Sequence, residues 1–128
     1  MNEKEWKRIA EREAKRYREH KAFQKGVEDA HGVVTDRYRR SVRWTLAVEY
    51  VLAYLHRVSE EKERFFRLYY ETDRPRRRTD KEGIAALSFQ LYASTATLYE
   101  WRKELRTLLV IAAAQTGALR PYTNDGEP

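Results

Sequence analysis

The sequence contains no cysteine, few residues that break helices and no long hydrophobic run. Without cysteine, disulfide bonds and thiolate chemistry are excluded. Five glycines and three prolines in 128 residues favour long helices over β structure with many turns. No apolar run approaches the roughly 20 residues of a membrane span, and the N-terminal stretch NEKEWKRIAER is charged where a signal peptide is apolar. We therefore expect a soluble cytoplasmic protein with no membrane partner.

The sequence does have enough apolar side chains for one compact core, together with a surplus of positive charge. Its hydrophobic fraction is 41%, and 26 basic against 20 acidic residues give a net charge of +6. A basic balance of this kind fits a polyanionic partner. Residues 1–45 carry 13 basic and 8 acidic side chains, and residues 71–106 carry 8 and 6. If a positively charged surface faces DNA, both segments would therefore contribute basic residues to it.

Hydrophobic residues recur at helical spacing along the chain, and no strand pattern competes with them. We expect helices over about 3–24, 36–57, 59–71, 80–91 and 94–115. The glycines that bracket KGVEDAHG, 25–32, predict the first break. The helix at 36–57 is apolar over so much of its surface that it should be central. The first helix has a narrower stripe, interrupted by Glu13, which suits loose docking or pairing with a second copy.

These helices predict an all-α fold of about five helices, with a C-terminal helix-turn-helix packed on a long central helix. We divide the chain into three segments: an N-terminal helical region at 1–57 that could support oligomerisation, a helix-turn-helix unit at 58–118, and a disordered tail at 119–128. Gly117 and Pro121 mark the end of the last helix.

The segment 79–106 has the local signals of a helix-turn-helix. Thr79 and Glu82 form a T-x-x-E capping box that opens its first helix. Ser94 is placed to cap its second helix, after a connection of about three residues. A short connection of this kind lets the second helix project outward, so that its polar N-terminus can enter the major groove of DNA.

The motif LSxxLYASxxTLYxWR at 87–102 is similar to the helix-turn-helix of the RinA and ArpU families of phage and prophage late-gene transcriptional regulators. That motif is related to region four of bacterial sigma factors. EKERFFRLYY at 61–70 also resembles the helix that leads into region four. The resemblance covers about 58–118. It implies a sequence-specific regulator that binds double-stranded DNA and that could also contact RNA polymerase.

The resemblance also assigns roles to residues of this sequence. Ser94 would cap the recognition helix, whose exposed amides could contact a phosphate. Contacts to bases or to the DNA backbone would come from Thr95, Thr97, Tyr99 and Lys103. Arg102 and Arg106 lie farther along the helix and are expected to contact phosphates.

The arginine-rich loop ETDRPRRRTDK precedes the first helix of the motif, where a DNA backbone would run. It supplies Arg74, Arg76, Arg77, Arg78 and Lys81. Two residues depart from the family pattern. Tyr92 stands where many such motifs have glycine, so it must find another backbone geometry or accept strain. Glu100 stands where a basic residue would suit DNA better; it could accept from a cytosine amino group or pair with Lys103 or Lys81.

No pattern in the sequence indicates catalysis, a metal site or a cofactor. His20, His31 and His56 are dispersed and lack metal-ligand spacing. There is no P-loop, dinucleotide fingerprint or nucleophile elbow. We predict a protein that is not an enzyme. Two other functions remain open: a helical protein–protein interaction module, such as an RNA polymerase-binding or phage-assembly factor, and a small terminase-like DNA-packaging subunit. The oligomeric state is open, and a homodimer is possible because paired half-sites are common for this motif.

Overall fold

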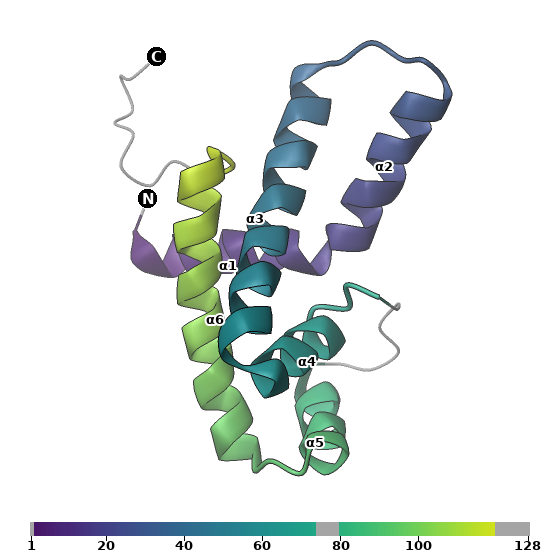
Figure 1. Cartoon of the computed structure of the whole chain (residues 1–128). Helices are drawn as coiled ribbons and strands as arrows, with labels where there is room; N and C mark the ends of the chain where they lie inside the picture. Colours follow the sequence, from purple (N-terminus) through teal and green to yellow (C-terminus); the bar gives the residue numbers. More distant parts are fainter. Residues whose placement is uncertain (1, 74–79, 120–128) are drawn as a thin grey trace.

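The computed structural model describes residues 2–73 and 80–119, except for the side chains of 80–82. All the secondary structure in this part is helical: α1 (Glu3–Lys15), α2 (Tyr17–Asp29), α3 (Asp36–Val58), α4 (Glu60–Tyr69), α5 (Asp80–Leu91) and α6 (Thr95–Thr116) (Figure 1). The all-α prediction is confirmed here, with six helices in place of about five. Within the same part, no helix is both long enough and apolar enough to cross a membrane.

The extra helix arises because the helix expected at 3–24 is two helices that meet at Arg16. The backbone there leaves α geometry, with φ −97° and ψ 13°, and Arg16 N donates to Glu13 O at 3.1 Å. The next helix, α2, continues past Gly26, since one glycine inside a helix costs only about 1 kcal/mol. It ends at Asp29, and His31, two residues further on, has a φ of +51°. The chain then turns back, so that α2 and α3 form an antiparallel pair (Figure 1).

The long helix α3 lies at the centre of the fold, where it packs on α1, α2, α4 and α6. The predicted inner face is confirmed, with buried side chains from Ala47, Val48, Val51, Leu52 and Leu55. Other apolar residues of the broad hydrophobic surface expected for this helix are not buried. Tyr50 is 51% exposed, and Leu46 and Tyr54 are also exposed. The remaining side of α3 therefore faces solvent.

The apolar stripe of the first helix is used inside the chain. Ala10 and Ala14 are fully buried where α1 packs on α6, and alanine at both positions lets the two helices approach closely. The face that suggested pairing with a second copy is thus already covered. At the other end of the chain, Leu119 was included in the expected tail, yet it is buried, and its N–H donates to Ala113 O at 3.0 Å. Residues 120–128 lie outside the described part.

Candidate nucleic-acid interface

The connection between α5 and α6 consists of three residues with a defined hydrogen-bond pattern. Ala93 N donates to Ser88 O at 3.2 Å, and Tyr92 N donates to Phe89 O at 3.4 Å. These two bonds form the Schellman pattern that ends many helices. The hydroxyl of Ser88 also donates to Ala93 O at 2.6 Å. Tyr92 takes the left-handed conformation, with φ +54°, that glycine would adopt more easily.

Replacement of Tyr92 by glycine is expected to stabilise the protein by about 0.5–1 kcal/mol. The left-handed conformation costs a residue with a Cβ atom roughly 1–2 kcal/mol, and the greater freedom of an unfolded glycine offsets part of that gain. The tyrosine side chain is 97% exposed, so its removal sacrifices little packing. Urea unfolding of Tyr92→Gly beside Tyr92→Ala measures the effect, because alanine keeps the backbone cost. Equal unfolding free energies for the two variants would contradict this account of the turn.

The inner side of α6 is anchored as the sequence predicts. Ser94 is the N-cap, and its Oγ accepts from Thr97 N at 3.1 Å. Leu98 is fully buried four residues after the cap, and Leu105 is fully buried two turns further on. Trp101 packs its ring against the edge of Phe65, with 5.9 Å between the ring centroids. The amino-terminal half of α6 therefore packs against the rest of the fold through the side that carries Leu98, Trp101 and Leu105.

The outer side of the same half carries exposed polar and aromatic residues. Tyr99 is 44% exposed, the Lys103 side chain is 75% exposed, and Thr95 is exposed in the first turn. Thr97 is half-buried, and its hydroxyl accepts from Ser94 Oγ at 2.9 Å. Glu100 Oε1 lies 3.9 Å from Lys103 Nζ, so the ion pair that the sequence suggested is present but loose.

The two arginines expected to contact phosphates point instead toward α1. Arg102 donates to both carboxylate oxygens of Glu11, at 3.1 Å from Nε and 3.0 Å from Nη2. Arg106 donates to Glu11 Oε1 from Nε at 3.0 Å and from Nη2 at 2.9 Å. Tyr70 Oη donates to the same carboxylate at 2.8 Å. One acid of α1 thereby ties α6 to the end of α4.

Glu11 is only 5% exposed, and its ionised form is strongly favoured. Burial alone would raise the pKa of this carboxyl, but the hydrogen bonds from Arg102, Arg106 and Tyr70 outweigh it and lower the pKa to about 2. Sequence reasoning missed this residue. Its position in the sequence could have indicated burial. Glu11 directly follows Ala10 and lies three residues before Ala14, so it borders the apolar stripe of the helix.

The remaining predicted site residues lie outside the described part of the chain. These are the loop arginines Arg74, Arg76, Arg77 and Arg78, together with the side chain of Lys81. The capping box falls there too, since Thr79 and the side chain of Glu82 are not described. Across the described residues, no group of three or more histidines and carboxylates is placed to hold a metal ion.

No family model, curated protein or solved structure matches the chain.

Proposed function

We propose that this protein binds double-stranded DNA through the amino-terminal half of α6 and regulates transcription, as an activator of phage or prophage late genes. One observation carries the proposal. A helix capped by Ser94 follows a three-residue connection, exposes Thr95, Tyr99 and Lys103 at intervals of four residues, and buries Leu98. This is the polarity that a recognition helix requires, with an apolar anchor inside and hydrogen-bonding groups outside. The resemblance of 87–102 to phage regulators supplies the regulatory role.

Each exposed group has a role that suits DNA. The first-turn amides of α6 and the positive end of its dipole favour a phosphate near Ser94. Thr95 and Tyr99 have hydroxyl groups that can bond to base edges or phosphates, and Lys103 supplies a positive charge. Because Glu11 holds Arg102 and Arg106, we assign these two arginines to anchoring α6 against α1.

Mobility-shift assays at low salt test the proposal with the variant Tyr99→Ala/Lys103→Ala. We expect it to lose about tenfold or more in DNA affinity, since it removes one aromatic hydrogen-bonding group and one cation from the reading face. Both side chains are exposed, so thermal unfolding should change little. An Arg102 variant is a poorer probe, because it would also break the contact with Glu11.

The matched control is Tyr50→Ala/Lys25→Ala, which removes an exposed tyrosine and an exposed lysine from α3 and α2. This variant should bind DNA like the wild type. Equal losses in the two double variants would indicate binding through diffuse charge. No binding by the wild type would contradict the proposed function itself.

A second candidate function is a protein-interaction module, for which RNA polymerase or a phage-assembly protein would be the partner. It is favoured by exposed apolar side chains on α3 and α6, which include Tyr50, Tyr54 and Ile111. These residues line part of a pocket of about 980 Å³. Exposed apolar patches of this kind are typical of interaction sites. The remaining alternative, a small terminase-like DNA-packaging subunit, would both bind DNA and form oligomers. Light scattering would detect those oligomers.

A further inference from the structure

A separate pocket of about 330 Å³ lies where the junction of α1 and α2 meets the first half of α3. Its lining includes Arg16, His20, Phe23, Arg37, Arg40 and Ser41. None of these residues belongs to α6 or to the α5–α6 connection. The pocket is thus independent of the proposed DNA-reading face.

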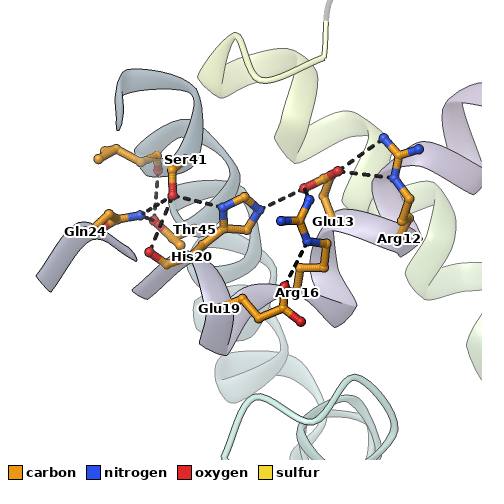
Figure 2. A network of polar contacts seen from close by, with 9 residues as sticks. Arg12, Glu13, Arg16, Glu19, His20, Gln24, Ser41 and Thr45 are labelled. Carbon is orange, nitrogen blue, oxygen red and sulfur yellow. Dashed lines mark hydrogen bonds and ion pairs between the residues drawn. The ribbon is translucent and has the colours of Figure 1, made fainter. Parts of the chain in front are cut away.

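Hydrogen bonds fix the inner wall of this pocket in place. Figure 2 shows the imidazole of His20 between Ser41 and Glu13. Its Nε2 lies 2.8 Å from Glu13 Oε1, and its Nδ1 lies 2.9 Å from Ser41 Oγ. Gln24 Nε2 donates to Ser41 Oγ at 3.0 Å. These side chains are therefore already ordered before a ligand binds, so binding does not carry the entropic cost of ordering them.

Ser41, His20 and Glu13 have the residue types of a nucleophilic triad, but their geometry favours a scaffold. Ser41 is only 4% exposed, and its Oγ accepts from Gln24. Its hydroxyl is therefore held by hydrogen bonds to His20 and Gln24 and is not free to attack a substrate carbonyl. The cluster is better suited to hold a wall of the pocket than to attack a substrate.

The acids that face the pocket are already neutralised by neighbouring cations. Glu13 lies 3.2 Å from Arg12 and 3.5 Å from Arg16, besides its contact with His20. Burial would raise the pKa of Glu13, but the hydrogen bond from His20 and the nearby arginines lower it below its usual value. Glu19 lies 3.1 Å from Arg16 Nε.

Two arginines at the pocket keep their hydrogen-bond donors unused. Within the described residues, neither Arg37 nor Arg40 forms an ion pair or a side-chain hydrogen bond. The Arg37 guanidinium stacks over the Phe23 ring at 4.3 Å, a contact that leaves its N–H edge open. The spacing of three residues places Arg37 and Arg40 on neighbouring turns of one side of α3.

We propose that this pocket binds a small phosphate-type oxyanion between Arg37 and Arg40, with His20 in its inner wall. Planar guanidinium groups match the oxygens of such an anion and bind them in a bidentate manner. The positive end of the α3 dipole adds to this attraction, because both arginines lie in the first turns of the helix. The volume is at the lower end of the range of about 300–1,000 Å³ for small-ligand sites, which fits a single small phosphate ester.

Titration of the full chain with inorganic phosphate, followed by amide and side-chain NMR shifts, tests this assignment. We expect saturable shifts at Arg37, Arg40 and His20, and a loss of about tenfold in affinity for Arg37→Ala and for Arg40→Ala. The matched control is Arg39→Ala. It removes the same charge from the same turn of α3, but Arg39 pairs with Asp36 at 3.0 Å and does not line the pocket.

Equal losses in Arg39→Ala and Arg40→Ala, or shifts that never saturate with phosphate or DNA, would overturn the proposal. A short DNA duplex at low salt distinguishes the source of the phosphate group. If Arg40→Ala weakens duplex binding and Arg39→Ala does not, the DNA backbone supplies the phosphate; if only inorganic phosphate shows the difference, a small phosphate ester does. Failure of all DNA binding would leave the phosphate titration unaffected, so the two proposals fail separately.

Discussion

Replacement of Glu11 by alanine is expected to lower the free energy of unfolding by about 3–5 kcal/mol, the usual cost of removing one partner from a buried ion pair. The change leaves the guanidinium groups of Arg102 and Arg106 without their acceptor, at positions where their side chains are 22% and 32% exposed. It also leaves the buried hydroxyl of Tyr70 without the carboxylate that accepts its hydrogen bond. Urea unfolding of the full chain measures the difference.

Glu3→Ala is the matched control for this variant. Glu3 is another acid of α1, but it is exposed and pairs with Lys7 at 3.0 Å on the helix surface. Exposed pairs of this kind contribute about 0–1 kcal/mol. If the two alanine variants differ by less than about 1 kcal/mol, Glu11 does not hold α6 to α1 in the way the structure indicates.

Acidification is expected to remove about 3 kcal/mol of stability through Glu11 alone, given a pKa of about 2 in the folded chain and an ordinary value of 4.5. Because folding lowers this pKa, the stabilisation is fully present above about pH 4.5 and is lost as the pH falls through about 2. Glu13, whose pKa is also lowered, adds a loss of the same sign.

Urea titrations between about pH 6 and about pH 2 measure this loss, and Glu11→Ala isolates the contribution of one residue. The wild type should lose more stability than the variant over that interval, so their unfolding curves should converge in acid. Parallel losses in the two proteins would show that Glu11 has an ordinary pKa in the folded state.

Sequence periodicity predicted the features of the fold that depend on local spacing. The inner face of α3, the Ser94 cap and the buried leucines of α6 are all visible in the sequence, because each follows from residue types at helical intervals. The break at Arg16 is not, since no glycine or proline marks it. The exposure of Tyr50 could not be predicted either. A hydrophobic pattern shows which residues are apolar, but it does not show which sides of the helix other helices cover.

The candidate site was predictable only in part, for a similar physical reason. The exposed face with Tyr99 and Lys103 follows from the register of α6 itself. The pairing of Glu11 with Arg102 joins residues far apart in the chain, and no local rule identifies such a partner. The pocket at the α1–α2 junction is also a product of tertiary structure, since Arg16 and Arg40 line the same pocket only after α2 folds back on α3.

Selection of bound duplexes from a random-sequence DNA pool tests the central claim most directly. The wild-type chain is expected to enrich a defined sequence motif, and Tyr99→Ala/Lys103→Ala is expected to lose that enrichment while Tyr50→Ala/Lys25→Ala retains it. Absence of an enriched motif with the wild type, or the same motif at the same strength with both double variants, would contradict reading of DNA by the amino-terminal half of α6.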